Sequence, residues 1–239
     1  MPDIIQQSPV TTGKSVVTFK YVTPKRVTAG NVLLMSVVVS NNATLSFSDT
    51  GKNAYKTINA FSSTSLSLYH IICFAKATGT LTITGTLSKT ANVTYNFLEL
   101  ANIDATAPVN STTKISSSSA KTLTINGNAD EDDSVLITLG LTTSQSSYGI
   151  GNPVPSYSYV GVNQSPTTSI GYQCAINSQS LSGSQTATWK FNLASSVAAL
   201  MTIFNDAVDT TASSDPNGLI AWDTNATMSM PWQTVYYGK

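Results

Sequence analysis

One short stretch of the sequence, SFSDTGKNAYKTINAF at residues 46–61, gathers side chains that could form a binding site. Asp49 offers a carboxylate and Asn53 an amide, and Tyr55 adds a hydroxyl. Carboxylate and amide oxygens bind Ca²⁺, which takes about six to eight of them. The same residues are typical of a turn between strands, in which Gly51 supplies a positive φ and Asn53 bonds to the nearby backbone. Two oxygen ligands fall short of a calcium shell, so the pattern favours the turn.

A second group of carboxylates is the run Asp130, Glu131, Asp132 and Asp133, just before an apolar segment. Four adjacent carboxylates could hold Ca²⁺, which makes Asp130, Asp132 and Asp133 candidate ligands. The alternative is a solvated loop tip, whose charges keep the edge of the next strand soluble. The sequence favours the loop tip, and we expect no cofactor.

Groups able to catalyse a reaction are scarce in this chain. His70 is the single histidine, so any Ser–His–Asp triad would need it, yet it lies in mid-strand between Leu68 and Ile72. Glu99 could be one of the two carboxylates that glycoside hydrolysis requires, but nothing marks its partner. A phosphate-binding glycine loop is absent from the sequence. We therefore expect a protein that is not an enzyme.

The composition is low in charge and rich in Ser, Thr and Asn. Charged residues make up 10% of the 239 residues, and 12 basic residues balance 12 acidic ones. Typical soluble domains have about 25% charged residues. Nucleic-acid binding needs clustered Lys and Arg, which are missing beyond Lys25 and Arg26. The apolar residues 32–39 are too few to cross a bilayer. These features exclude nucleic acid and membrane insertion, and a neutral surface favours contact with neighbouring subunits because like-charge repulsion is missing.

The N-terminus and the cysteines bear on where the protein acts. Residues 1–6 lack the basic and apolar regions of a secretion signal, so we expect cytoplasmic synthesis or a signal that has been trimmed. Together with a composition typical of extracellular proteins, this indicates a virion component that is released by lysis. Cys73 and Cys174 lie in apolar segments and are expected to be buried free thiols. Two cysteines and one histidine do not make a zinc site.

The pattern of the chain is β throughout. Short apolar or alternating segments are separated by Gly, Asn and Ser, which predicts an all-β fold, an antiparallel β-sandwich or jelly-roll-like domain over residues 1–208. A period of two places His70 on one face with Leu68 and Ile72. The Ser/Thr-rich residues 110–120 are expected to be a long crossover within this domain. The predicted strands cover residues 15–22, 31–40, 66–74, 80–86, 93–100, 121–126, 134–142, 184–193 and 196–204.

Residues 209–239 form a C-terminal extension of different composition. A turn-rich link, DTTASSDPNG, leads into a segment that contains two of the three tryptophans. The aromatic side chains of this segment must be buried, either against their own sandwich or on a neighbouring subunit. Trp and Tyr are favoured anchors at interfaces, so the second interpretation makes the segment a docking arm. Its interface residues would be Trp222, Trp232, Tyr236 and Tyr237.

Three further aromatic residues could bind a glycan. Tyr148, Tyr157 and Tyr159 lie in a loop-rich stretch with several Gly and Pro residues. Exposed aromatic rings stack on the faces of sugars, which would make this stretch a glycan contact. The alternative is ordinary apolar filling of a loop.

The motifs VTAGNVLL at residues 27–34 and SDTGKNAY at residues 48–55 are followed, in order, by segments at 69–76, 79, 81–84, 99–100, 106–109 and 198–204. In this order they resemble a family of Ser/Thr-rich β-sandwich modules of bacterial surface proteins and phages. Lys52 departs from the family's pattern as an extra residue between Gly and Asn, and residues 209–239 lie outside it. The resemblance covers roughly residues 15–204 and implies a structural or adhesive role, with no catalytic role known for the family.

We therefore expect a non-enzymatic structural protein of a virion. In its most concrete form it is a phage capsid decoration (cement) protein, or a fibre or tail accessory, that docks on other virion proteins and on copies of itself. The alternative is a secreted surface module for adhesion or carbohydrate binding.

Overall fold

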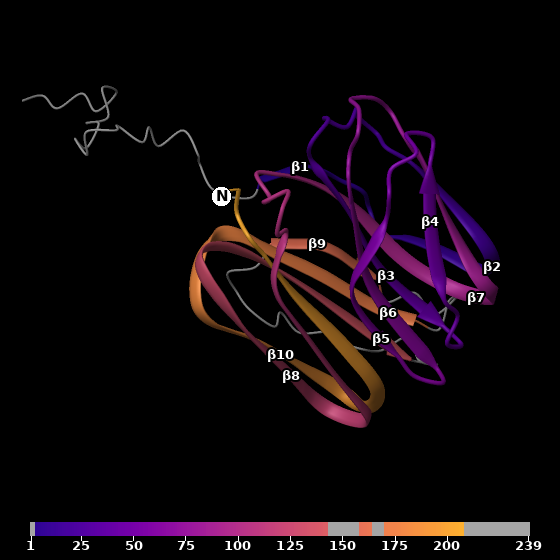
Figure 1. The fold of residues 1–239 in the computed structure, drawn as a ribbon. Coiled ribbons are helices and arrows are strands. Elements are labelled where there is room, and N and C mark those ends of the chain that lie inside the picture. Colours follow the sequence, from indigo (N-terminus) through magenta and orange to yellow (C-terminus); the bar gives the residue numbers. More distant parts are fainter. Residues whose placement is uncertain (1–2, 143–157, 164–169, 208–239) are drawn as a thin grey trace, which may run out of the picture. The chain divides into compact units, whose positions relative to one another are not determined.

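A computed structural model describes residues 3–142, 158–163 and 170–207 of the chain. The described residues contain no helix, and all of their strand pairs are antiparallel, in two sheets that pack against each other (Figure 1). The prediction of an all-β antiparallel sandwich is therefore confirmed. The strands are β1 (Asp3–Gln7), β2 (Thr11–Val22), β3 (Val32–Ser40), β4 (Leu45–Asp49), β5 (Lys56–Ser62), β6 (Leu66–Phe74), β7 (Thr82–Ala101), β8 (Val109–Thr142), β9 (Ser158–Asn163) and β10 (Ile170–Phe204).

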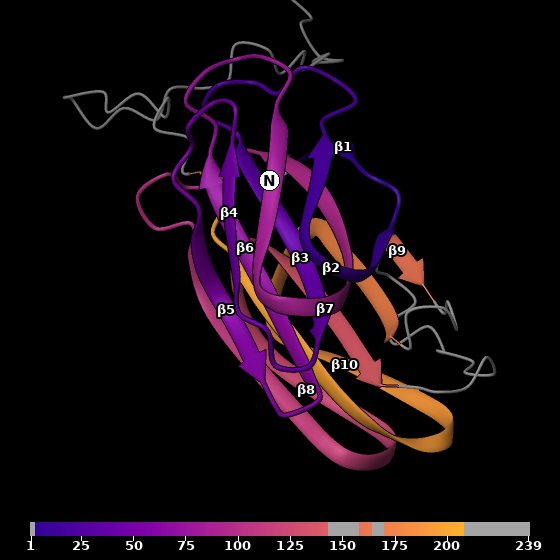
Figure 2. The ribbon, with the colours of Figure 1, turned by 90° about the vertical axis from the view of Figure 1, so that its right-hand side faces the viewer.

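The first sheet is organised around the long strand β7. One side of β7 pairs with β1 and then with β2, and the other side pairs with β3 and then with β4. Beyond β3 the sheet continues to β6 and ends at β5. The beginning of β7, with β4 and the end of β2, forms an outer layer over the face of β3 and β6 (Figure 2). The two predicted segments 80–86 and 93–100 are thus one strand that serves two layers.

In the second sheet, β8 and β10 each fold back on themselves. The last part of β10, residues 196–204, lies between the first part of β8 (109–117) and its last part (134–142). The first part of β10 pairs with the last part of β8 and with β9. The middle parts of β8 and β10, at residues 122–129 and 183–190, pair with each other as a ribbon.

The sequence predicts a crossover at residues 110–120, and this prediction is wrong. These residues belong to the first part of β8, and the passage between the sheets is made by residues 102–108 just before it. Most side chains of residues 110–120 are exposed or half-buried. A strand at the edge of a sheet needs no apolar alternation, so its Ser/Thr composition resembles that of a loop.

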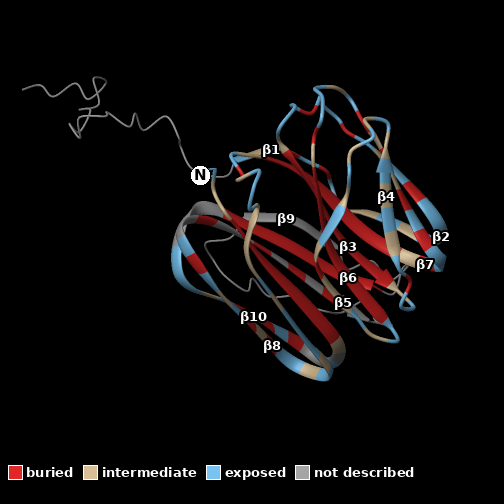
Figure 3. Cartoon of the chain, in the orientation of Figure 1, coloured by how far each residue is buried: buried red, intermediate tan, exposed pale blue. Residues whose placement is uncertain are grey.

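Three apolar cores separate the layers, and the strands that face them are coloured as buried in Figure 3. The first lies under the outer layer of the first sheet, the second between the two sheets, and the third between the second sheet and the ribbon. Strand β3 contributes side chains to the first and the second core: Leu33 and Met35 lie in the first, and Leu34 and Val38 lie in the second. A strand with both faces covered reads as a continuous apolar run, which explains its sequence NVLLMSVVVS.

The end of β10 alternates between the second and third cores in the same way. Ala198 and Leu200 lie in the second core, and Val197 and Met201 lie in the third. Trp189 is fully buried in the third core, as its alternation with exposed Lys190 predicts. Residues 196–204 therefore form a core strand, as expected from their β-branched residues.

The cysteines are free and buried, as predicted. Cys73 lies in the first core and Cys174 in the second, so they cannot pair across this fold. Burial raises the pKa of Cys73 to about 12 and that of Cys174 to about 11, which keeps both as thiols at neutral pH.

We expect the outer layer to depend on the absence of a side chain at Gly85. A Cβ atom there would overlap the ring of Phe19, which packs against Tyr95 at a centroid distance of 4.5 Å. Gly85→Ala should therefore lower the free energy of unfolding by about 1–3 kcal/mol, as overpacking does. Urea unfolding measures the loss.

The control for this substitution is Gly79→Ala, because a Cβ at Gly79 meets nothing within 4 Å. In a Phe19→Leu background, Gly85→Ala should cost less than in the parent protein, because the smaller side chain leaves room. Equal losses in both backgrounds would show that the overlap with Phe19 is not the cause.

Candidate functional site

The stretch that could have held a metal is a turn built around the carboxylate of Asp49. Asp49 Oδ1 accepts a hydrogen bond from the backbone N of Asn53 at 3.1 Å, and Oδ2 accepts from Asn53 Nδ2 and from the Tyr55 hydroxyl, both at 2.8 Å. Asn53 Oδ1 in turn accepts from the backbone N of Lys76 at 2.9 Å. The polar side chains that suggested a site therefore bond to each other and fasten the turn to the start of the next loop.

The positive φ of this turn lies at Lys52 and not at Gly51. Lys52 has a φ of 52°. Gly51 leaves room for a neighbouring side chain, because a Cβ there would approach Leu81 Cδ2 to 2.9 Å. The side-chain amine of Lys76 donates to the Lys52 carbonyl oxygen at 2.7 Å, which helps to hold the residue in its left-handed conformation.

Glu99 is fully buried at the end of β7, where a loop closes over it. Its Oε1 accepts from the backbone N of Thr28 at 2.8 Å and from Asn31 Nδ2 at 2.7 Å, and its Oε2 accepts from Gln6 Nε2. Gly30, between these two donors, has a φ of 89°, which glycine adopts without strain. The segment VTAGN is therefore a clamp on a buried carboxylate, and Glu99 has no open cleft in which to act on a sugar.

The acidic run lies inside β8, where the ribbon passes into the last part of the strand. Asp133 is 3% exposed, and its Oδ2 accepts from the backbone N of Asp130 at 2.8 Å and from Asn110 Nδ2 at 2.7 Å. Asn110 Nδ2 also donates to Asp130 Oδ2. The expectation of a solvated loop tip is thus wrong for Asp133, because its carboxylate fixes the bend of the strand. The side chain of Asp132 lies outside the described residues, and the described part of the chain holds no group of three or more His, Cys, Asp or Glu suited to a metal.

His70 faces the second core, as its alternation predicts, and it bridges the two sheets. Its Nδ1 lies 2.7 Å from Thr202 Oγ1, and its Nε2 lies 2.7 Å from Thr138 Oγ1. Burial lowers the pKa of His70 to about 3, so the ring is neutral at pH 7. A neutral imidazole has one donor and one acceptor nitrogen, so one threonine donates to the ring and the other accepts from it. Asn59 Nδ2 extends the contact by donating to Thr202 Oγ1 at 3.3 Å.

The same chain of hydrogen bonds continues from Thr138 to β3, β10 and β7. The hydroxyls of Thr138 and Ser36 are 2.7 Å apart. The Tyr172 hydroxyl lies 2.8 Å from Ser36 Oγ and donates to Asn96 Oδ1, which can only accept. All of these side chains are fully buried. A buried histidine beside hydroxyls could suggest a catalytic centre, but here it has no solvent access and serves to hold the sheets together.

Among the described residues, an open surface with room for a partner lies between the edges of the two sheets. Strand β5 ends the first sheet, and the first part of β8 is an edge of the second; the two strands lie next to each other (Figure 2). Asn59 Nδ2 joins them by donating to the Thr113 carbonyl oxygen at 3.1 Å, and Lys114 Nζ donates to the Ala60 carbonyl oxygen at 3.4 Å. We call this strip the edge groove.

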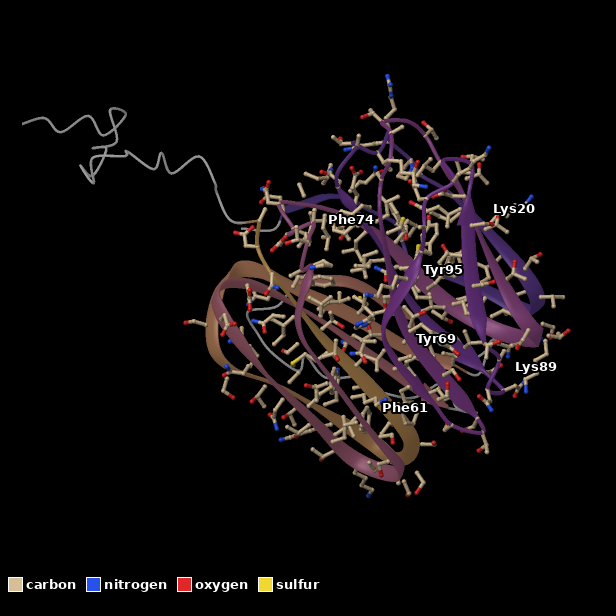
Figure 4. All side chains as sticks on the ribbon, in the orientation of Figure 1. Lys20, Phe61, Tyr69, Phe74, Lys89 and Tyr95 are labelled. Carbon is tan, nitrogen blue, oxygen red and sulfur yellow. The ribbon has the colours of Figure 1, made fainter. Side chains whose placement is uncertain are left out.

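A hollow lies on each side of the Asn59 bridge. The first has a volume of about 330 Å³ and is lined by Ile58 and Ile72 together with residues 106–109. The second has a volume of about 210 Å³ and is lined by Phe61 and by serines of both sheets, among them residues 116–118. Phe61 points into the space between the sheets (Figure 4). The edge groove was not predicted, since it depends on two strands far apart in the sequence.

The remaining predicted site residues are only partly described. Tyr148 and Tyr157 lie outside the described residues, and of Tyr159 only the backbone is described, in β9 opposite Ala175. Trp222, Trp232, Tyr236 and Tyr237 also lie outside the described residues. The structure therefore leaves the glycan contact and the docking arm as predictions. Among the described residues, no helix is long and apolar enough to span a membrane.

Comparison of the chain with models of known protein families, with curated proteins and with solved structures finds no match. The resemblance of residues 15–204 to the Ser/Thr-rich sandwich modules therefore stays a prediction from the sequence.

We expect Asp49 to stabilise the fold without a metal. Asp49→Ala removes the acceptor of three hydrogen bonds in a half-buried turn, so it should lower the free energy of unfolding by about 1–3 kcal/mol. Thermal unfolding, with and without added Ca²⁺ or a chelator, measures both effects. Asp3→Ala, which changes an exposed carboxylate, is the control and should have little effect. A large rise of the melting temperature in Ca²⁺ that is lost in Asp49→Ala would show that the turn is a metal site after all.

We expect the protein to lose stability below the ordinary pKa of histidine because of His70. The folded-state pKa of about 3 lies below the unfolded value of 6.5. The unfolded chain therefore binds this proton first, and the stability present above pH 6.5 is lost as the pH falls towards 3. The slope is about 1.4 kcal/mol per pH unit, or about 2 kcal/mol between pH 6.5 and 5.

Urea unfolding of the parent and of His70→Gln at about pH 7.5 and about pH 5 tests this. The variant should show a smaller pH dependence by about 2 kcal/mol, whatever its stability at neutral pH. The carboxylates are the same in both proteins, so their titration cancels in the comparison. An unchanged pH dependence would mean that another group is responsible.

Proposed function

We propose that the chain is a non-enzymatic structural protein of a virion, a capsid decoration (cement) protein or a fibre or tail accessory that docks on neighbouring subunits. The observation that supports this most is where the reactive side chains lie. Of the described residues, His70, Glu99 and both cysteines are buried, and Asp49 bonds within its own turn. Each of them contributes to the fold, which supports a scaffold role for the body.

The outer layer presents a surface suited to contact with neighbours. Its exposed face carries rows of hydroxyl side chains across paired strands, such as Ser46 opposite Thr86 and Ser48 opposite Thr84. Thr86 in turn lies opposite Thr18 of β2. Such a face carries little charge, so copies or partners can approach it without strong repulsion. Exposed Lys20 of β2 lies opposite Thr84, so a positive charge stands at the end of one of these rows (Figure 4).

The layered architecture also suits a part that must last outside a cell. Strands far apart in the sequence pair in both sheets, and three cores are closed by them. Local opening of such a structure requires the loss of many long-range contacts, which limits access for proteases.

The alternative is a secreted surface module for adhesion or carbohydrate binding. The uncharged hydroxyl rows of the outer layer favour it, because hydroxyl groups can exchange hydrogen bonds with the hydroxyls of a glycan. This role would not require self-association.

Mass in solution separates the two proposals. Light scattering with size exclusion should give an oligomer for the full chain and a monomer for a chain that ends at Val208, because the aromatic arm would be the docking element. Circular dichroism must show that the shortened chain keeps its β structure. If the shortened chain unfolds, residues 209–239 are part of the core, and the hypothesis that they form a docking arm is wrong. Monomers in both cases would favour the alternative, and a glycan array would be the next experiment.

A further inference from the structure

In the part of the chain that the structure describes, each sheet of the sandwich has an edge without a strand partner, and the two edges lie side by side. Among the described strands, β5 pairs only with β6, and the first part of β8 pairs only with the end of β10. Each edge therefore presents a row of backbone N–H and C=O groups without a strand partner. Such edges attract a further strand unless charge, proline or another segment blocks them. The described edges carry only Lys56 and Lys114, and Lys114 bonds back to Ala60.

The apolar core between the sheets reaches the surface along this side. Ile58, Phe61 and Val109 are only half-buried, although they pack against the second core. The two hollows of the edge groove, about 330 and about 210 Å³, lie at either end of this apolar strip. A cavity of about 150 Å³ holds a benzene ring, so each hollow has room for one aromatic side chain.

The described chain ends beside the edge groove. The backbone N of Ala207 donates to the Asn102 carbonyl oxygen at 2.9 Å, and that of Asn205 donates to the Pro108 carbonyl oxygen at 3.2 Å. Pro108 also lines the first hollow. Residues 208–239 continue from this point with a turn-rich link at 209–218, which spans up to about 35 Å when extended. That reach is enough to leave one copy and meet the groove of the next.

We propose that residues 219–239 of one copy dock in the edge groove of a neighbouring copy. The segment adds as an extended strand to one of the open edges, and its aromatic side chains enter the two hollows. Main-chain hydrogen bonds then supply affinity, and the hollows supply specificity. Because each copy offers one arm and one groove, the contact joins donor to acceptor and extends from copy to copy. This inference rests on the proposed assembly function and identifies the surface that receives the arm.

Two substitutions in the full-length chain block the hollows without touching a core. Ala107→Arg and Ser118→Arg place a charged side chain at exposed positions that line the first and the second hollow. Their matched controls are Ala29→Arg and Ser184→Arg, at exposed positions that line neither hollow and lie outside the hydroxyl rows of the outer layer. Light scattering over a concentration series should show at least tenfold weaker association for the first pair and parent-like oligomers for the second.

The outcomes distinguish this inference from the proposed function. If all four variants assemble like the parent while the chain ending at Val208 is monomeric, the arm docks on another surface. The proposal that the edge groove receives the arm is then wrong, and the proposed assembly function is unaffected. If the full-length parent is monomeric at every concentration, self-assembly fails and the groove proposal fails with it.

Disulfide trapping tests whether the contact joins two chains. Ala107→Cys in one tagged full-length copy and Gln233→Cys in a second, differently tagged copy should give a mixed covalent dimer on oxidation. The native cysteines are buried and do not compete. A chain that carries both substitutions and cross-links only within itself would overturn docking between copies. Replacement of Ala107→Cys by Ala29→Cys should abolish the trapped dimer.

Discussion

The buried hydrogen-bonded chain centred on His70 is the interaction on which the arrangement of the two sheets depends. Apolar packing between sheets has no direction, so the second core alone would tolerate several relative placements. His70 of β6 needs two hydroxyls at once, and it finds them on Thr138 of β8 and Thr202 of β10. A slip by one residue would turn these hydroxyls to the other face and leave a buried imidazole without partners. The cost of unpaired polar groups in a low-dielectric core makes this one register strongly preferred.

The same chain explains why strands as long as β7, β8 and β10 keep a single geometry. Tyr172 joins β10 to Asn96 of β7 and Ser36 of β3, and Asn59 joins the edge strand β5 to the end of β10 through the Met201 carbonyl oxygen. Every strand that borders the centre of the second core therefore contributes at least one polar contact. The long strands can bend and belong to two layers because these polar contacts fix their positions at the second core. In the first and third cores, packing is supplemented by single bonds such as that from Trp189 Nε1 to Gln173 Oε1 at 2.6 Å.

Local patterns were sufficient to predict the strand faces but not the partners across the fold. Alternation in β6 placed His70 on the face of Leu68 and Ile72, and alternation in β10 buried Trp189, since both depend only on the period of a strand. The hydroxyls that meet His70 lie 68 and 132 residues away and look like any other Thr in a Thr-rich chain. The turn at Asp49 was predicted because its bonds are local.

Errors arose where tertiary contacts override the local signal. The first part of β8, residues 109–117, has a loop-like composition because most of its side chains face solvent. The pattern of apolar residues therefore did not indicate that it pairs with β10. Asp133 looked like a solvated charge, but Asn110 and the Asp130 backbone bind its carboxylate. The positive φ fell on Lys52, whose carbonyl oxygen accepts from Lys76 Nζ of a later loop, a partner that the local sequence does not show.

A body that uses its reactive groups internally has few ways left to interact. The hydroxyl rows of the outer layer offer many similar hydrogen-bonding groups, which give little basis for selecting one partner. The edge groove differs, because it combines open backbone groups with two apolar hollows whose position is set by the Asn59 bridge. The polar network that fixes the register of the sheets ends at that same Asn59, through Thr202. The geometry of the groove is therefore held by the chain of bonds that orders the core, so a docking segment meets a preformed surface and loses less entropy on binding.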